Sequence, residues 1–342
     1  MHGKRKQEHI EICLNEDVRS AVSTGLENYR LIHQALPEMA LDDVDTSSSF
    51  LGHSLGAPLL LSAMTGGAPE AAAINRRLAA AAQQFGLPMG LGSQRSGLED
   101  PAAMATYQVR DVAPDILLFA NLGAVQLNYG YGLSECRRAV EAVGADALVL
   151  HLNPLHEAVQ PQGDTDFRGL TGKIAAICRG LSVPVIVKEV GWGLSPEAAL
   201  ALREAGVAAL DVAGAGGTSW SEVERYRSAS PNAAEVAAAF SDWGIPTAEA
   251  LVTVRQACPA VPLIASGGII NGVQAALCLA LGADLVGIAH AVLAAANQSP
   301  EAAAKRVRVV LQELRTAMFC AGARTVAALD RTRIVLRGEA YR

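Results

Sequence analysis

The stretch from residue 151 to residue 166 concentrates side chains that can bind a metal ion. His151, Asn153, His156 and Glu157 follow a short apolar run, and further amides and carboxylates come after them. One carboxylate among neutral donors suits a Mg²⁺ ion that keeps several waters and is shared with a substrate phosphate. The chain has no short Cys/His spacing typical of zinc, so zinc is not expected. These residues alone leave two interpretations open, a Mg²⁺ site and a solvated loop.

Glycine pairs follow two later apolar runs. Gly216-Gly217 and Gly267-Gly268 stand where backbone N–H groups and a helix N-terminus commonly bind phosphate in α/β barrels. One pair alone would be explained better by a tight turn. The two pairs together favour a phosphate-bearing cofactor.

Lys188 ends an otherwise apolar run, where an unpaired ammonium group would be costly. It is therefore expected to face a ligand, and next to an electron-rich ring such as a flavin it would stabilise negative charge. The alternative is a structural salt bridge with Glu189 or Asp211.

The elements that must position these residues follow a repeating pattern from about residue 58. Short apolar runs alternate with Ala-rich stretches of helical pattern. Every run is strongly apolar, so none has the polar pattern typical of a strand at the edge of an open sheet. Eight such units predict a closed TIM (β/α)₈ barrel of the α/β class, whose sites are built at strand C-termini. The expected strands are 58–64, 89–93, 117–122, 147–152, 184–190, 209–213, 262–266 and 285–289, and the expected helices lie near 70–86, 101–112, 133–143, 169–180, 196–205, 247–257, 272–281 and 299–321.

Two stretches exceed the minimal barrel. Residues 1–57 form an N-terminal extension to the barrel of residues 58–342, and both belong to one domain. A long loop after the sixth strand, from Ala215 to about Pro246, carries Trp220, Tyr226 and Trp243. Long loops at this end of a barrel usually carry function.

Composition excludes several classes of partner. The 342 residues carry a net charge of -6, which gives no general attraction to nucleic acid or to an anionic membrane. An anionic ligand must then be held by a local basic cluster such as Lys4, Arg5 and Lys6. After the basic N-terminal residues, acidic residues stand where a signal peptide would need an apolar run, so secretion is not expected. The six scattered cysteines are typical of reduced thiols. A cytoplasmic protein is therefore expected. The apolar stretch 275–296 is interpreted as helix, turn and buried strand rather than a membrane span.

Motifs distributed over nearly the whole chain resemble those of type 2 isopentenyl diphosphate isomerases, in the order of that family. They are Arg5-Lys6-x-x-His9-Ile10, Met64-Thr65-Gly66-Gly67, Gly92-Ser93-Gln94-Arg95, His151-x-Asn153, Gly163-Asp164, Lys188-Glu189-Val190-Gly191 and Gly214-Ala215-Gly216-Gly217-Thr218-Ser219-Trp220.

The resemblance implies an FMN barrel that interconverts isopentenyl and dimethylallyl diphosphate. Reduced FMN would act as acid and base, Mg²⁺ would bind the diphosphate, and NADPH would supply the reducing equivalents. Protonating an unactivated alkene generates a tertiary carbocation. The protein must therefore bind and orient the substrate and the cofactor and exclude water from the site. The family is usually tetrameric or octameric, which implies a homo-oligomer.

The resemblance also implies roles for individual residues. Arg5 and Lys6 would fold over the barrel mouth as a lid, at the site of their own subunit or of a neighbouring one. Glu157 would bind Mg²⁺, and His151, His156 and Trp220 would be catalytic. The substrate would contact Arg5, Lys6, His9, Ser93, Arg95, His151, Asn153 and His156, and FMN would contact Ala63, Met64, Thr65, Ser93, Asn121, Lys188, Thr218, Gly267, Gly268, Ala289 and His290.

Five positions depart from the family pattern. His156 replaces a glutamine expected near the reacting carbons, Gln162 replaces an acidic residue, and Ala213 replaces a serine. Ile270 and His290 stand where arginines are common. These departures leave three alternatives open: a slow or altered prenyl diphosphate enzyme, an α-hydroxy-acid oxidase-like flavin enzyme, and a non-catalytic prenyl diphosphate or flavin binder.

Overall fold

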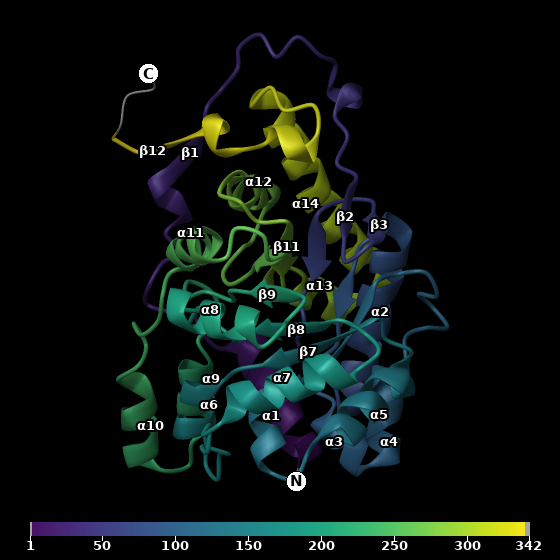
Figure 1. The fold of residues 1–342 in the computed structure, drawn as a ribbon, viewed down its shortest axis with the longest axis vertical. Helices are drawn as coiled ribbons and strands as arrows, with labels where there is room; N and C mark the ends of the chain where they lie inside the picture. Colours follow the sequence, from purple (N-terminus) through teal and green to yellow (C-terminus); the bar gives the residue numbers. More distant parts are fainter. Residues whose placement is uncertain (1, 339–342) are drawn as a thin grey trace.

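Eight parallel strands close into a barrel in the computed structural model, which describes residues 2–338, with side chains from Arg5 onward (Figure 1). The strands follow one another around the barrel in sequence order, and each coincides with a predicted strand, although β6 extends one residue beyond its predicted end. They are β4 (Leu59–Leu61), β5 (Met89–Gly90), β6 (Leu118–Gly123), β7 (Ala147–His151), β8 (Val185–Lys188), β9 (Ala209–Asp211), β10 (Leu263–Ala265) and β11 (Leu285–Ile288). The predicted TIM barrel is confirmed.

Strand residues alternate between two hydrophobic cores. Inward-facing side chains such as Leu60, Phe119 and Val149 fill the barrel, while their neighbours pack against the surrounding helices. Phe50 and Leu55, from the hairpin of β2 (Ser48–Phe50) and β3 (His53–Leu55), join the inner core. The parallel register pairs Gly123 with His151 and His151 with Lys188. The C-terminal ends of β6, β7 and β8 therefore lie level with one another.

Helices surround the barrel, and most lie where the sequence predicts them. Ser195 illustrates a local cause, because its side chain accepts a hydrogen bond from Ala198 N–H and caps α8. The longer barrel helices are α2 (Pro69–Phe85), α5 (Leu133–Val143), α7 (Leu170–Gly180), α8 (Pro196–Glu204), α11 (Thr247–Ala257), α12 (Gly272–Ala280), α13 (His290–Gln298) and α14 (Pro300–Cys320).

Two expectations about secondary structure were wrong. The helix expected near 101–112 is only α4 (Pro101–Met104) and a 3-10 turn (Ala105–Tyr107), which places the Tyr107 hydroxyl to donate to Ser93 O. The long loop after the sixth strand contains two helices, α9 (Trp220–Arg227) and α10 (Pro231–Ala238). Ser230 caps α10 and Pro231 is its first residue, so the sequence did carry a helix start signal there.

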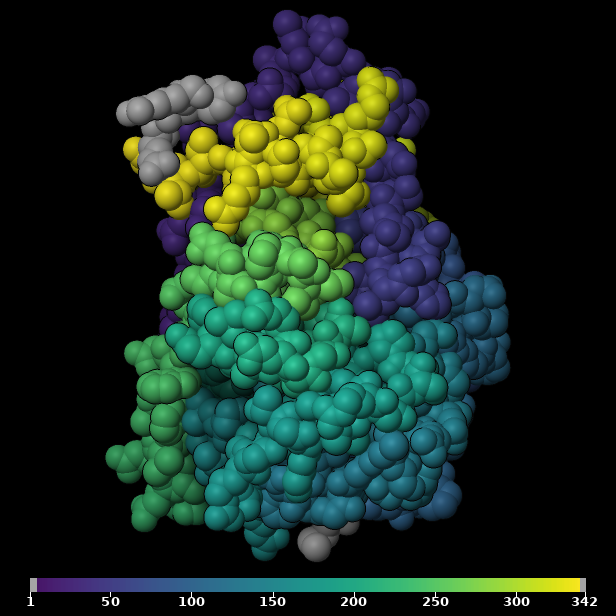
Figure 2. All heavy atoms as spheres, in the orientation of Figure 1, coloured from purple at the N-terminus to yellow at the C-terminus, as the bar shows by residue number. Residues whose placement is uncertain are grey.

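The N-terminal extension contacts both ends of the barrel. Helix α1 (His2–Asn15) packs against α9, and α9 also contacts α6 (Pro154–Val159). The short helix α3 (Arg95–Glu99) comes directly after β5 in the chain. Beside α12, on the outside of the barrel, β1 (Tyr29–Leu31) pairs antiparallel with β12 (Ile334–Leu336). Figure 2 shows the yellow C-terminal segment beside the purple N-terminal extension. Within residues 2–338, no helix is both long and apolar enough to cross a membrane.

Candidate active site

A cavity of about 660 Å³ lies at the C-terminal ends of the barrel strands, a size typical of small-molecule and cofactor sites. Strand ends, the loops after them and helix α1 form its walls. Every residue to which the resemblance assigned a catalytic, substrate, cofactor or metal role lines this cavity, whereas the Lys4 side chain lies outside the described residues. The residues with an assigned role are Arg5, Lys6, His9, Ala63, Met64, Thr65, Ser93, Arg95, Asn121, His151, Asn153, His156, Glu157, Lys188, Thr218, Trp220, Gly267, Gly268, Ala289 and His290.

Helix α1 brings positive charge into this cavity. Arg5 donates from Nη1 to Gln160 Oε1 at 3.2 Å, but its Nε is buried without an acceptor among the described residues. Burial and, to a smaller extent, repulsion from Arg5 lower the pKa of the neighbouring Lys6 to about 8. An anion at this place would satisfy the Arg5 donor and stabilise the ammonium form of Lys6.

Glu157 lies buried in a network at the start of α6. Its Oε1 accepts from Asn153 Nδ2 at 2.9 Å, and its Oε2 accepts from Gln160 Nε2 and from the Asp164 N–H at 2.8 Å. Asn153 Oδ1 is buried and has no partner within the described chain. One carboxylate beside a free amide oxygen is a donor set that fits Mg²⁺ with retained waters.

Arg95 is already engaged in ion pairs. Its Nη1 lies 2.7 Å from Asp164 Oδ2, and its Nε lies 3.2 Å from Glu99 Oε1. Gln126 Nε2 donates to the same Asp164 oxygen at 3.0 Å. A substrate diphosphate would therefore have to compete with two carboxylates for Arg95, unlike Arg5.

His151 is held as a neutral ring. Its Nδ1 lies 2.8 Å from Asn121 Oδ1, and in this arrangement Nδ1 carries the proton and Nε2 offers a lone pair. Burial, together with the charges of Lys188 and Lys6, lowers the pKa of His151 well below its ordinary value. The ring is thus an acceptor or a proton-transfer group rather than a source of positive charge.

Lys188 does not form the salt bridge that was its alternative interpretation. Its ammonium donates to the backbone oxygen of Glu189 at 2.5 Å, while Asp211 accepts from Ser266 Oγ at 2.6 Å. The Glu189 side chain turns away to accept three backbone N–H bonds, from Val190, Gly191 and Trp192. Lys188 itself lines the cavity and remains able to reach a ligand.

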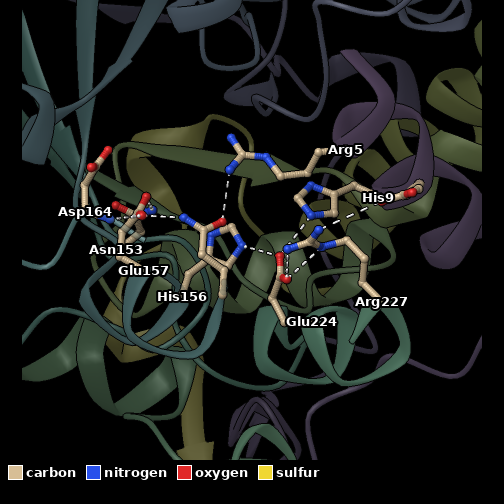
Figure 3. Close-up of polar contacts among 10 residues, drawn as sticks. Arg5, His9, Asn153, His156, Glu157, Asp164, Glu224 and Arg227 are labelled. Atoms are coloured by element: carbon tan, nitrogen blue, oxygen red, sulfur yellow. Dashed lines mark hydrogen bonds and ion pairs between the residues drawn. The ribbon is translucent and has the colours of Figure 1, made fainter. Parts of the chain in front are cut away.

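A cluster of two histidines, a glutamate and an arginine lies where α1, α6 and α9 meet (Figure 3). His9 Nε2 and His156 Nε2 each lie 3.0 Å from Glu224 Oε1, and Arg227 donates from Nε to Glu224 Oε2 at 2.8 Å. The Trp220 ring lies 5.3 Å from the His9 ring and 5.2 Å from the His156 ring.

This cluster fixes the charge of Glu224, whose side chain is only 1% exposed. Burial raises the pKa of this carboxyl, but the hydrogen bonds from His156, His9 and Arg227 outweigh burial and hold it below its ordinary range. Sequence reasoning did not single out Glu224. The available signal was its spacing, since it follows Trp220 by four residues and so shares a helix face with it.

Unpartnered polar atoms also mark the opposite part of the cavity. Ser62 Oγ and Thr65 Oγ1 are buried and lack partners in the described part of the chain. Helix α13 begins at the cavity with His290, so its first N–H groups are available to an anion. The glycine pairs also allow two loops to pack closely. A Cβ on Gly217 would lie only 2.5 Å from Gly268 N and would clash with it.

Comparisons with known proteins show which family the chain belongs to. The family model of FMN-dependent dehydrogenases matches residues 134–336. The chain is 57% identical to the isopentenyl-diphosphate delta-isomerase of Synechococcus sp., covering 96% of this chain and 94% of the relative. It is 53% identical to that of Cronobacter sakazakii, covering 98% of both chains. The chain belongs to the isopentenyl-diphosphate delta-isomerase family. The sequence-based assignment to this family is confirmed.

Solved structures place this isomerase family member among flavin barrels in fold. A mandelate oxidase structure superposes with a TM-score of 0.69 over 97% of this chain and 98% of that chain, at 19% identity. Such identity establishes the common fold alone.

The five departures from the isomerase pattern have distinct places in the structure. Ala213 and Gln162 adopt left-handed backbone conformations, with φ of 37° and 59°. Ile270 is half exposed, and its backbone oxygen accepts from Arg306 Nη2. His290 Nε2 lies 3.3 Å from Cys13 O and so connects α13 to α1. His156 differs from the rest, because it joins a buried ion-paired cluster.

Proposed function

We propose that this protein interconverts isopentenyl and dimethylallyl diphosphate with reduced FMN and Mg²⁺. The observation that carries the proposal is the buried, unpartnered Arg5 Nε in a cavity of a barrel from this isomerase family. A diphosphate supplies the acceptor that this donor lacks, and Lys6 adds a second positive charge beside it. Arginine suits this task because its guanidinium binds phosphate oxygens in a fixed geometry.

FMN would occupy the part of the cavity lined by the C-terminal ends of the barrel strands. When bound and reduced, it would supply the acid and base of the reaction, and NADPH would provide the electrons that reduce it. The unpartnered hydroxyls of Ser62 and Thr65 fit a ligand rich in polar atoms. The flavin contacts would come from Ala63, Met64, Thr65, Ser93, Asn121, Lys188, Thr218, Gly267, Gly268, Ala289 and His290.

Glu157 would hold Mg²⁺, which would supply positive charge to the diphosphate. The unpartnered Asn153 Oδ1 beside Glu157 supports this role, since it offers a neutral oxygen next to the carboxylate. Arg5, Lys6 and His9 would contact the diphosphate, with Ser93 and Arg95 at the strand ends. Arg95 would contribute after leaving one of its two carboxylates.

The aromatic and charged side chains near α9 would stabilise positive charge on the hydrocarbon part of the substrate. Proton addition at the terminal alkene carbon creates a tertiary cation, and loss of a proton from the adjacent methylene completes the isomerisation. The Trp220 ring offers a negative π face, and Glu224 is held ionised nearby. His151 and His156 would orient the substrate and accept or return protons at their ring nitrogens.

Two further properties belong to this proposal. All six cysteines are free thiols, which supports a reducing, cytoplasmic location. Val236 and Trp243, on and after α10, are 55% and 59% exposed, and such an apolar surface suits contact with another copy in a homo-oligomer. Light scattering on the purified protein would show a tetramer or an octamer.

The test is an anaerobic assay with FMN, Mg²⁺ and isopentenyl diphosphate, run with and without a reductant. The proposal expects the dimethylallyl isomer only when the flavin is reduced. Equal turnover with oxidised flavin would overturn the cofactor role, and FMN binding without turnover would indicate a non-catalytic binder. Oxidation of a hydroxy acid with flavin reduction would support the oxidase-like alternative.

A further inference from the structure

The cluster at α1, α6 and α9 contains three potential metal ligands that converge on one point. His9 Nε2, His156 Nε2 and a carboxylate oxygen of Glu224 all lie within 4.8 Å of one another. Each histidine nitrogen is 3.0 Å from the same oxygen, Oε1. Figure 3 shows both rings directed at the Glu224 carboxylate. The three residues are distant in sequence and are brought together only by the fold.

These distances are close to those of a tetrahedral metal site. Zinc bonds imidazole nitrogen and carboxylate oxygen at about 2.0–2.2 Å, so two ligands of a tetrahedral ion lie roughly 3.3–3.6 Å apart. The two nitrogen-to-oxygen separations need to open by a few tenths of an ångström to reach that geometry, and the two histidine nitrogens, which lie within 4.8 Å of each other, need to reach a similar separation. Two imidazoles and one carboxylate are also a zinc donor set that leaves a fourth position open. Mg²⁺, by contrast, prefers oxygen ligands.

The surroundings of the three ligands favour metal binding in two further ways. Arg227 binds Glu224 through Oε2 and so orients the carboxylate while leaving Oε1 directed at the histidines. Trp220 packs against both rings and limits their rotation. Both histidines line the cavity, so water or a phosphate oxygen can reach the fourth position. Burial also lowers the pKa of His9 to about 4, which keeps that ring neutral, as a metal ligand must be.

We propose that, while no substrate occupies the cavity, His9, His156 and Glu224 form a site for a divalent transition metal ion such as Zn²⁺ or Co²⁺. The ion takes the place of the two ring protons that now point at Glu224 Oε1, and these protons move to Nδ1 of each ring. This site is separate from Glu157, which serves the oxygen-preferring Mg²⁺. The nearby positive charges of Arg5, Lys6 and Arg227 oppose a divalent cation, so binding is weaker than at a structural zinc site.

Metal binding has a structural consequence. The three ligands lie on three helices, so the ion connects α1 to α6 and α9. Such a connection would hold the N-terminal helix against the barrel. Added Zn²⁺ is therefore expected to slow hydrogen exchange of the α1 backbone.

The test is a Co²⁺ titration of the full-length protein free of Mg²⁺, followed by visible absorption. Four-coordinate Co²⁺ absorbs strongly, whereas Co²⁺ among six oxygen ligands at Glu157 absorbs weakly, so the spectrum separates the two sites. The proposal expects the strong band in the unaltered protein. It expects loss of the band in His156→Gln and in Glu224→Gln. Glu157→Gln should retain it, as should the control His53→Gln, which alters an exposed histidine elsewhere.

Three results would overturn the proposal. One is the absence of the strong band in the unaltered protein. Another is an unchanged band in both His156→Gln and Glu224→Gln, with circular dichroism confirming that each variant is folded. The third is loss of the band in Glu157→Gln alone. None of these results depends on isomerase turnover, so the metal site and the proposed function are tested separately.

Discussion

The ion pair between Glu224 and Arg227 gives a quantitative prediction about stability. Glu224 Oε2 lies 2.6 Å from Arg227 Nη2, and the two side chains are 1% and 17% exposed. Substituting glutamine for Glu224 removes the negative charge but keeps the size and one acceptor oxygen. Arg227 then lacks its closest counter-charge, and Glu8, with an oxygen 3.9 Å from Nη1, compensates only in part. Removing one partner of a buried ion pair lowers the free energy of unfolding by about 3–5 kcal/mol. Because Arg227 is partly exposed, we expect the lower end of this range, about 3 kcal/mol.

The same helix supplies a matched control. Glu222 and Arg225 form another pair with the same spacing, 2.6 Å apart, but Arg225 is 32% exposed. Glu222→Gln is therefore expected to cost about 1 kcal/mol or less. Urea unfolding of both variants without added metal or substrate, followed by circular dichroism, measures the difference. Equal losses for the two variants, or a larger loss for Glu222→Gln, would refute the claim that the Glu224 cluster is a buried charge network.

Three other substitutions give distinct readouts. Glu157→Ala should abolish Mg²⁺-dependent turnover while FMN stays bound, as measured by flavin absorbance after gel filtration; unchanged Mg²⁺ dependence would remove Glu157 from the metal site. His156→Gln should retain or raise the isomerase rate, because glutamine is the residue of the family pattern, and a complete loss would make His156 an evolved catalytic group. Burial raises the pKa of Glu189 to about 7 from about 4.5 when exposed, although three backbone hydrogen bonds oppose the shift. The folded state thus binds more protons between these values, and the free energy of unfolding should fall by up to about 3 kcal/mol as pH rises from about 4.5 to about 7. Glu189→Gln should flatten this dependence in urea unfolding, and an identical pH profile in the variant would contradict it.

The barrel could be predicted because its strands carry a strong apolar signal. Runs such as Ala147–His151 are buried along most of their length, and eight of them alternate with amphipathic helices. Polar residues at the strand ends could also be placed, since barrel strands all end at one face. Asn121, His151 and Lys188 were identified in this way, and all line the cavity.

The two helices in the long loop after the sixth strand, α9 and α10, could not be predicted from apolar periodicity. Helix α9 has the sequence WSEVERYR, and its buried residues include Glu222 and Glu224, which are accommodated by ion pairs rather than by hydrophobic contacts. From the sequence alone, a buried glutamate in such a helix cannot be distinguished from a solvent-exposed one, because its ion-pair partners are not known. The partners of Glu224 include His9 and His156, far away in the chain. The departure at His156 was visible in the sequence, but its contact with Glu224 required the fold.

The most direct test of the central claim is isomerisation in deuterated water under anaerobic conditions, with reduced FMN and Mg²⁺. The proton that adds to the terminal alkene carbon would then come from a site in exchange with solvent. The account predicts dimethylallyl diphosphate with deuterium in a methyl group, formed only with reduced flavin. Unchanged isopentenyl diphosphate without deuterium, in protein that binds FMN normally, would contradict it.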